Sequence, residues 1–479
     1  MTLAEIIALR MQYKISQIKL AEASGFSPAT ISSWELNKRI PSERELSRLE
    51  GTLNSIIRDI DSNVKDIRKK RIKKSGKVDG KIPSAISSKS EYQELLSACQ
   101  TKEKTPYVEQ LSQMYAAATQ KKDTNAPKAI ALFSGCGGMS LGFAAAGYAL
   151  VGHLDIEDSA NVIYEMNFDG SDLLGTDITK VSDDELHRWT KKYGEIDVLI
   201  GGPPCQGFSL AGKRDPNDLR NQLYKYYVHI VSVIKPKVFV MENVRLLTSM
   251  KTPDGGLFID KIIEGFGKAG YTISKKEVNA CEYGVPQSRE RIILVGVRND
   301  INKGFFTFPE PTHAIDPQPN LWSTGEKKVV TFRDATSDLQ LLESGEQSSD
   351  PLHWAISHPV HVIEWLKDVP EGQSAHDNEN PNLRPPSGFN TTYKRIMWDE
   401  PCSTISTNFS MISGCRNVHP MSTRSLTIRE AARAQSFPDE FVFSGNWGNV
   451  RKAIGNAVPP LLAEVIAKSI MKQLFTEQD

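Results

Sequence analysis

Cys205 is the strongest candidate for a reactive group in this 479-residue chain. It lies in Gly-Gly-Pro-Pro-Cys-Gln-Gly-Phe-Ser, directly after the apolar run 198–201. The two prolines fix the backbone before the cysteine, and a thiol is a strong nucleophile once it loses its proton. A helix N-terminus or a nearby arginine promotes that loss. The alternative is a buried structural cysteine in a tight loop, which the polar residues after Cys205 disfavour.

One acid and two arginines border other apolar runs. Glu242, in Met-Glu-Asn-Val, ends the first of these runs. Burial favours the protonated form of a carboxyl group, which suits a general acid. Arg289 and Arg291 alternate in Gln-Ser-Arg-Glu-Arg and therefore share one side of a strand, where they suit an anionic or carbonyl partner. The alternative for the arginines is a surface ion pair with Glu290.

A glycine-rich turn, Phe-Ser-Gly-Cys-Gly-Gly, occupies 133–138 between an apolar run and a helical stretch. Glycines let the backbone approach a ligand closely, and the helix N-terminus offers free N–H groups. Asp155 ends the next apolar run, where an acid can bind ribose hydroxyls, and Asp177 suits an adenine amino group. The alternative is an ordinary tight turn without a cofactor.

Strand-like and helical stretches alternate from residue 128 onward. The strand-like runs are Ala129–Phe133, Leu150–Leu154, Val198–Gly201, Val238–Met241 and Ile292–Val297. The helical stretches include Asp158–Asn167, Leu223–Ile234 and Leu257–Ala269. This order predicts an α/β fold, with a doubly wound, mostly parallel sheet covered by helices on both faces. Ligands of such sheets bind at the carboxyl ends of the strands, where the motifs above are found.

The remaining segments set the domain organisation. A Pro- and Asp-rich stretch breaks the alternation, and predicts an irregular insert at 301–420 between two parts of one α/β domain, 127–300 and 421–479. Residues 53–126 are expected to form a basic, partly helical linker, because 65–81 holds nine basic residues against two acidic ones. Such a tract either grips phosphates without reading sequence or serves as a solvated tether.

Residues 1–52 carry a helix-turn-helix signature similar to that of phage repressors. A helix over 16–24, a break at Gly25 and a second helix over 28–35 capped by Ser27 fit this pattern. The second helix would enter the major groove of DNA. The residues expected to face DNA are Ser27, Ala29, Thr30 and Ser33. The alternative is a small helical bundle without a DNA role.

Taken together and in order, the motifs resemble those of the C5-cytosine DNA methyltransferases of restriction-modification systems. The resemblance runs from about Ala129 to the end of the chain and includes the segments 424–439 and 455–460. It implies the S-adenosylmethionine-dependent methyltransferase fold, S-adenosylmethionine as cofactor and double-stranded DNA as partner. By its position it also implies that the insert at 301–420 is a target-recognition domain, and that 127–300 and 421–479 form the catalytic domain. It also implies that Cys205 adds to C6 of a flipped-out cytosine, that Glu242 contacts N3, and that Arg289 contacts the carbonyl with Arg291 in support.

The resemblance implies two further sets of contacts. The expected cofactor residues are Phe133, Gly135, Gly138, Asp155, Ile156, Asp177, Ile178, Gly202, Pro204, Leu223 and Asn456. The family usually has Glu where Asp155 stands. The loop 210–222 resembles a lid that closes over DNA. The expected DNA contacts are Gln206, Ser209, Lys213, Arg214 and Arg220 around this loop, and Lys394 and Arg395 in the insert, whose segment 390–398 could instead be a core strand.

Composition limits the remaining function classes. The formal net charge is zero, but residues 1–126 carry 22 basic and 15 acidic side chains, so a nucleic-acid partner is not excluded. The six cysteines form no CxxC pair, and we expect no metal site, no disulfide framework, no membrane span and a cytoplasmic, prokaryotic location. The alternatives are a transfer-RNA methyltransferase and a transcription regulator with an inactive enzyme domain. A role as autorepressor and a cognate restriction enzyme are further hypotheses.

Overall fold

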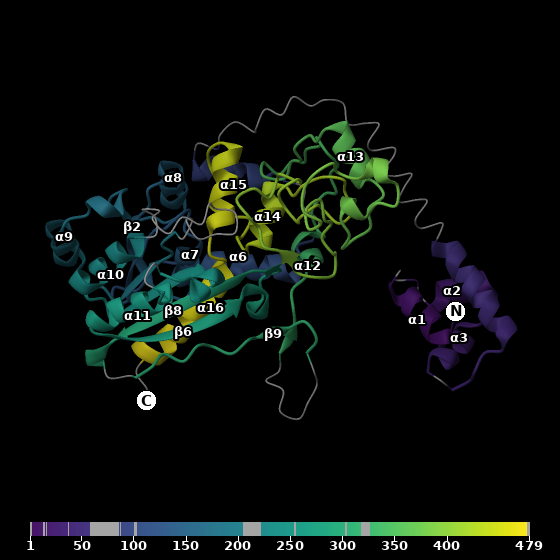
Figure 1. The fold of residues 1–479 in the computed structure, drawn as a ribbon, viewed down its shortest axis with the longest axis horizontal. Helices are drawn as coiled ribbons and strands as arrows, with labels where there is room; N and C mark the ends of the chain where they lie inside the picture. Colours follow the sequence, from purple (N-terminus) through teal and green to yellow (C-terminus); the bar gives the residue numbers. More distant parts are fainter. Residues whose placement is uncertain are drawn as a thin grey trace. The chain divides into compact units, whose positions relative to one another are not determined.

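The chain forms two compact units, Met1–Gly76 and Lys77–Asp479, in a computed structural model (Figure 1). The structure describes residues 2–12, 15, 17–36, 38–57, 86, 88–99, 103–204, 222–252, 255–301, 304–317 and 326–476. Each unit is described by itself below.

The first unit has the predicted helix-turn-helix arrangement. Helices α1 (Leu3–Gln12), α2 (Gln17–Ser24) and α3 (Pro28–Glu35) are followed by a helical stretch over 43–57. The Ser27 hydroxyl caps α3 by accepting the Thr30 N–H at 3.0 Å, as the sequence predicted. Trp34 is fully buried and meets Phe26 edge-on, with ring centroids 5.0 Å apart. The turn between α2 and α3 is therefore fixed by the packing of Phe26 against α3.

The second unit is built on the predicted doubly wound sheet. Its strands are β1 (Lys128–Leu132), β2 (Ala149–Leu154), β3 (Asp172–Leu173), β4 (Val198–Gly201), β5 (Val238–Val244), β6 (Tyr271–Asn279) and β8 (Glu290–Arg298). Within the described residues their order is β3-β2-β1-β4-β5-β8-β6, and only β8 runs antiparallel to its neighbours. Because the chain reverses its direction of growth between β1 and β4, the crevice for a ligand lies at their carboxyl ends.

Alternate residues of β1 enter two separate cores, one on each face of the sheet. Ala129 and Ala131 join the core formed with α7 (Gly138–Ala145), α8 (Asp158–Asn167) and α16 (Pro460–Ile470). Ile130 and Leu132 join the core formed with α9 (Asp183–Tyr193), α10 (Leu223–Ile234) and α11 (Phe258–Lys268). Gly142 lets α7 and α16 touch, since a Cβ there would lie 2.5 Å from the Pro460 carbonyl oxygen. The helix α7, which begins in the glycine-rich turn, is thereby held rigidly.

The described residues of the range 86–119, which the sequence assigned to a linker, form a layer of the second unit. This layer contains α5 (Lys89–Ser97) and α6 (Pro106–Thr119). Tyr92 is fully buried, and its hydroxyl donates to the Asp439 carbonyl and accepts from Arg429, both at 2.6 Å. The Tyr107 hydroxyl donates to the Arg433 carbonyl at 2.8 Å. Helix α14 (Ile428–Ala434) is therefore covered by this layer.

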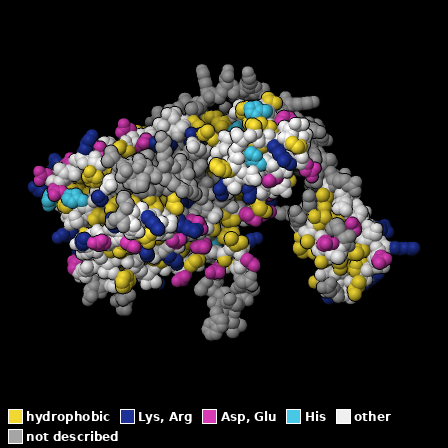
Figure 2. All heavy atoms as spheres, viewed as in Figure 1, with side chains coloured by type: hydrophobic (Ala, Val, Ile, Leu, Met, Phe, Trp, Pro, Cys, Tyr) yellow, Lys and Arg dark blue, Asp and Glu magenta, His cyan; other side chains and the backbone are white. Residues whose placement is uncertain are grey.

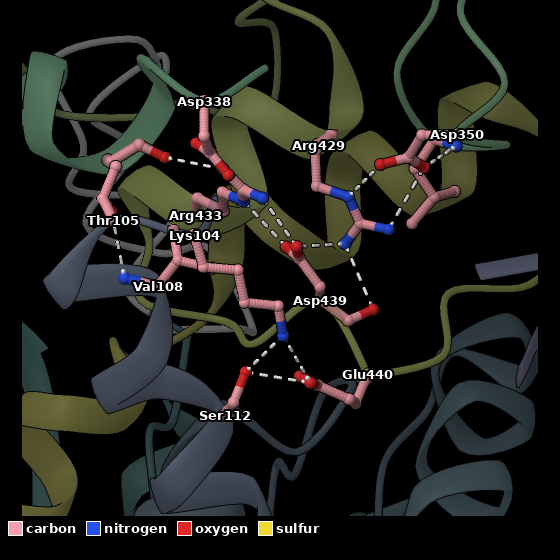
Figure 3. A network of polar contacts seen from close by, with 12 residues as sticks. Lys104, Thr105, Val108, Ser112, Asp338, Asp350, Arg429, Arg433, Asp439 and Glu440 are labelled. Atoms are coloured by element: carbon pink, nitrogen blue, oxygen red, sulfur yellow. Dashed lines mark hydrogen bonds and ion pairs between the residues drawn. The ribbon is translucent and has the colours of Figure 1, made fainter. Parts of the chain in front are cut away.

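A buried ionic network holds α14 against the insert (Figure 3). Arg433 pairs with Asp338 and Asp439, each at 2.6 Å, and Arg429 pairs with Asp350 at 2.6 Å. Both arginines are at most 1% exposed, so their charges need these carboxylates. The two guanidinium groups hold the pKa of Asp439 below its usual range against the opposing effect of burial.

The insert is mostly irregular, as predicted. Its elements and those that follow are β9 (His313–Ala314), β10 (Lys327–Lys328), α12 (Phe332–Thr336), α13 (Val360–Leu366), β11 (Cys402–Ser403), α15 (Trp447–Asn456) and the π-helical turn Met471–Phe475. β11 pairs with β7 (Gln287–Ser288) in a separate two-stranded sheet, which ties the insert to the segment just before β8. Acidic and basic side chains are interspersed over the face drawn in Figure 2. In the described part of the chain, no helix is long and apolar enough to cross a membrane.

Candidate active site

The loop that leads to Cys205 is braced by the strand β5. The Asn243 side chain, 3% exposed, donates to the Pro203 carbonyl at 3.0 Å. The Glu242 carboxylate lies against Gly202, where a Cβ would be 2.9 Å from Oε2. Cys205 itself lies outside the described residues. Glu242 and the loop that precedes Cys205 are nevertheless neighbours, as adjacent parallel strands β4 and β5 require.

Glu242 and Arg291 form an ion pair at the end of β5. The Arg291 Nε lies 2.8 Å from the Glu242 Oε1, and the two side chains are 13% and 12% exposed. Their strands are antiparallel, with Glu242 opposite Ile293 and Val244 opposite Arg291, so the two side chains converge across the pair. The pair places a carboxyl group and a guanidinium side by side, and with the carboxyl group protonated the two can donate to a ring that has adjacent nitrogen and carbonyl acceptors.

Arg289 does not occupy the position that the sequence analysis expected. It is 2% exposed, and its Nη1 and Nη2 donate to the carbonyl oxygens of Ile405 and Gly455, each at 3.1 Å. We expected Arg289 to contact a base and Arg291 to support it, but the structure reverses these positions. The reason is that Arg289 points into the junction between insert and sheet, while Arg291 points toward Glu242.

The glycine-rich turn after β1 is organised by Asp155. Phe133 and Gly135 both have positive φ, 51° and 54°, and the Gly135 N–H donates to Asp155 Oδ2 at 2.7 Å. Asp155 Oδ1 accepts the Glu157 N–H at 2.9 Å. Burial raises the pKa of Asp155, and these two N–H groups oppose that rise. Asp155 thus links the turn after β1 to the turn after β2.

The other expected cofactor residues lie around the same sheet edge. Ile156 follows β2 and is 68% exposed. Asp177 caps a turn by accepting hydrogen bonds from Thr179, and the Thr179 hydroxyl lowers the pKa of Asp177. Ile178, the next residue, is buried. The remaining expected residues are Gly138 at the start of α7, Gly202 and Pro204 after β4, Leu223 at the start of α10 and Asn456 at the end of α15.

This edge has features of a nucleoside-type cofactor site. The Ser134 hydroxyl is buried and has no hydrogen-bond partner among the described residues. A Cβ on Gly135 would meet no atom of the described residues within 4 Å, so these residues leave space beside the turn. Ile156 exposes an apolar side chain beside a carboxylate. The donor set therefore fits S-adenosylmethionine. The described residues contain no group of three or more His, Cys, Asp or Glu that could hold a metal ion.

The expected DNA contacts fall into three groups. On α3, Ser27 and Ala29 are exposed, and Thr30 and Ser33 are half-buried. Lys394 is exposed. The residues Gln206, Ser209, Lys213, Arg214 and Arg220 lie outside the described part of the chain.

Arg395 is not placed to contact DNA, contrary to the sequence analysis. It is 1% exposed, and its Nη1 donates to the His419 and Ser422 carbonyls at 2.8 and 2.6 Å. Its Nη2 donates to the Leu366 carbonyl at 2.7 Å. Adjacent residues of an extended segment point to opposite sides, so Lys394 faces solvent while Arg395 faces the core of the insert.

Sequence reasoning missed a set of buried amides behind the ion pair. Gln287 and Gln435 are both fully buried and bond to each other at 2.8 Å. Gln287 opens the motif Gln-Ser-Arg-Glu-Arg, and Gln435 lies in the segment 424–439. Both motifs were recognised in the sequence, but nothing in it indicated that the two side chains meet.

Comparisons with known proteins agree with this geometry. The profile of the family described as C-5 cytosine-specific DNA methylase matches residues 127–472, and a helix-turn-helix profile matches residues 6–56. The chain belongs to the C-5 cytosine-specific DNA methylase family. It is therefore a DNA (cytosine-5-)-methyltransferase that carries an N-terminal helix-turn-helix domain.

Two relatives and one solved structure illustrate the likeness. The chain is 38% identical to the Type II methyltransferase M1.HphI of Haemophilus parahaemolyticus, over 73% of this chain and 87% of that protein. It is 34% identical to the Type II methyltransferase M.DdeI of Desulfomicrobium norvegicum, over 71% and 88%. A crystal structure described as a prophage-encoded DNA modification methyltransferase of Escherichia coli has a TM-score of 0.56 and 26% identity, covering 73% of this methyltransferase and all of that chain.

Proposed function

We propose that this methyltransferase is the modification enzyme of a Type II restriction-modification system. It transfers a methyl group from S-adenosylmethionine to C5 of a flipped-out cytosine in duplex DNA, through a covalent bond between Cys205 and C6. The observation that supports this most strongly is the Glu242–Arg291 pair beside the loop that leads to Cys205. Relatives named as Type II methyltransferases support the restriction-modification context and a cognate restriction enzyme as partner.

Each group of this chain has a defined task in the reaction. The Cys205 thiolate adds to C6, which makes C5 electron-rich. In its protonated form the Glu242 carboxyl group donates to N3, and the Arg291 guanidinium donates to the neighbouring carbonyl, so both draw electron density from the ring. Once C5 has accepted the methyl group, the C5 proton leaves to a base and the bond between sulfur and C6 breaks, which restores the thiolate and the C5–C6 double bond. Extrusion of the base costs a few kcal/mol, which these pocket contacts offset.

The cofactor site is proposed at the carboxyl ends of β1, β2 and β4. Asp155 and Ile156 hold the ribose of the cofactor, and Asp177 and Ile178 hold its adenine. The turn Phe133–Gly138 holds the remainder, and Gly202, Pro204, Leu223 and Asn456 complete the site. When bound, S-adenosylmethionine supplies an electrophilic methyl group.

Trapping on modified DNA tests the proposed covalent step. A duplex that contains 5-fluorocytosine at the modified position cannot lose a proton from C5, so we expect a stable protein–DNA adduct. The Cys205→Ala variant should form no adduct and should transfer no methyl group. Cys99→Ser is the matched control, since Cys99 lies at the end of α5, outside the site. Methyl transfer by Cys205→Ala at the wild-type rate would refute the mechanism, and a preference for transfer RNA over duplex DNA would refute the substrate.

A second function is proposed for the N-terminal unit. The exposed residues at the start of α3 support binding to an operator, by which the enzyme represses its own gene. Removal of residues 1–76 should leave methyl transfer intact and abolish a footprint on the upstream promoter. A footprint that survives this deletion would contradict the proposal.

A further inference from the structure

Three buried side chains meet behind the Glu242–Arg291 pair and form what we name the polar hub: Gln287, Arg289 and Gln435. All three are at most 2% exposed. Gln287 and Gln435 bond to each other, with the Gln287 Nε2 donating to the Gln435 Oε1 at 2.8 Å. They come from the segment before β8 and from the end of α14, which are 148 residues apart in the sequence. Buried amides and guanidinium groups are costly without hydrogen-bond partners, and every side-chain nitrogen of the hub except the Arg289 Nε has one, so the hub fixes its neighbours in one geometry.

The hub grips both main-chain groups of Ile405. The Gln287 Oε1 accepts the Ile405 N–H at 2.7 Å, and the Arg289 Nη1 donates to the Ile405 carbonyl at 3.1 Å. Ile405 belongs to the segment 403–410, which we name the insert wall. The wall continues β11, the short strand that pairs with β7. Its position relative to the main sheet is therefore set from two directions at a single residue.

The hub also grips the end of α15. The Arg289 Nη2 donates to the Gly455 carbonyl at 3.1 Å, and the Gln435 Nε2 donates to the Ile454 carbonyl at 2.6 Å. Gly455 lies directly against the insert wall, since a Cβ there would be 2.4 Å from the Thr407 nitrogen. The residue after Gly455 is Asn456, which stands among the proposed cofactor residues. The hub thus connects the wall of the insert with the cofactor side of the site.

A second contact joins α15 and the wall outside the hub. The Arg451 Nη1 donates to the Ser410 hydroxyl at 2.7 Å, one turn before Gly455 on the same helix. On its other side, α15 carries Lys452, which pairs with Glu157 at 2.6 Å, next to the exposed Ile156. Helix α15 therefore lies between the insert wall and the turn after β2, and its C-terminal end is held by the hub.

From these contacts we propose that Arg289 is a positioning residue and not a contact to the target base. Together with Gln287 and Gln435 it holds the insert wall and the Gly455–Asn456 turn in register with the Glu242–Arg291 pair. Arginine suits this task because its planar fork points two donors at carbonyls of two different segments, which a lysine ammonium cannot do with the same geometry. This inference rests on the proposed function, since it assumes that Asn456 borders the cofactor and Arg291 the base.

Binding of S-adenosylmethionine to the full-length enzyme without DNA separates the two roles of Arg289. A base contact cannot affect this binding, because no base is present. A positioning residue should affect it through the Gly455–Asn456 turn. For Arg289→Met we expect the Kd for S-adenosylmethionine to rise about tenfold and kcat on DNA to fall roughly 10- to 100-fold, as displacements near 1 Å produce. The shape of the pH profile of kcat should stay that of the wild type, because Glu242 and Arg291 remain paired.

Two further variants make the test decisive. Gln287→Met removes the amide without changing charge and should raise the same Kd in the same direction, so it replaces Arg289→Met if that variant does not fold. Arg298→Met, at the other end of β8, is the control and should bind S-adenosylmethionine like the wild type. Wild-type Kd values for both hub variants would overturn the positioning role, whereas a wild-type enzyme that binds no S-adenosylmethionine would overturn the proposed function itself and the inference with it.

Discussion

Replacing Tyr92 with Phe tests whether the layer 86–119 is part of the folded enzyme. The hydroxyl of Tyr92 makes two hydrogen bonds of 2.6 Å, one to the Asp439 carbonyl and one from the Arg429 guanidinium. Phe keeps the ring and its packing but removes both bonds. A buried polar group left without its partner costs about 1–3 kcal/mol.

The structure narrows this estimate. The Asp439 carbonyl keeps only a 3.3 Å bond from Arg429 Nη1. Arg429 keeps its ion pair with Asp350 at 2.6 Å. The Arg429 N–H that loses the Tyr92 hydroxyl therefore costs less free energy than an unpaired buried charge would. The two losses together give a decrease of about 2–4 kcal/mol in the free energy of unfolding of the catalytic unit. Urea unfolding of the full-length chain at pH 7 measures this decrease as a lower midpoint.

Tyr115→Phe is the matched control for this prediction. Tyr115 lies in the same layer, on α6, and is 7% exposed, but its hydroxyl has no hydrogen-bond partner among the described residues. Its removal should change the free energy of unfolding by less than about 0.5 kcal/mol. If both variants lost the same stability, or if Tyr92→Phe unfolded like the wild type, the reasoning that ties this layer to α14 would be refuted.

Further predictions follow from the same contacts. Removal of residues 1–76 should leave a folded enzyme with a cooperative thermal transition, whereas removal of 1–119 should give insoluble protein, because it uncovers α14; solubility and calorimetry distinguish the two. Burial lowers the pKa of His358 to about 4, and its Nε2 accepts the Ser425 N–H at 3.1 Å. The His358 side chain therefore binds a proton at a higher pH in the unfolded chain than in the folded one. As the pH falls from about 6.5 to about 4, the free energy of unfolding should decrease by about 3 kcal/mol in total, and above about pH 6.5 the contribution of His358 is intact. A wild-type slope of stability against pH in His358→Gln over that window would contradict this. Arg395→Met should cost about 3 kcal/mol or more because it strips buried carbonyls of their donors, while Lys394→Ala should leave stability within about 0.5 kcal/mol; paired denaturant titrations compare them.

Local pattern was sufficient where an element carries its own signals. The helices α3, α8 and α10 have the bounds expected from sequence, and Ser27 caps α3 as its type and position indicated. The central strand β4 is buried along its whole length, so it reads as a continuous apolar run. The edge strand β6 was missed because most of its residues are only partly buried and many are polar, which leaves no apolar run to detect.

The sequence by itself determined the order of the chemical groups along the chain and the sheet edge at which they gather. It could not determine which of two alternating arginines faces Glu242, nor which of Lys394 and Arg395 faces solvent. Those outcomes depend on carbonyl groups supplied by distant segments, such as Ile405 and Gly455, which lie 116 and 166 residues from Arg289. A guanidinium group is stable inside a protein only where such acceptors converge, and only the tertiary structure brings them together.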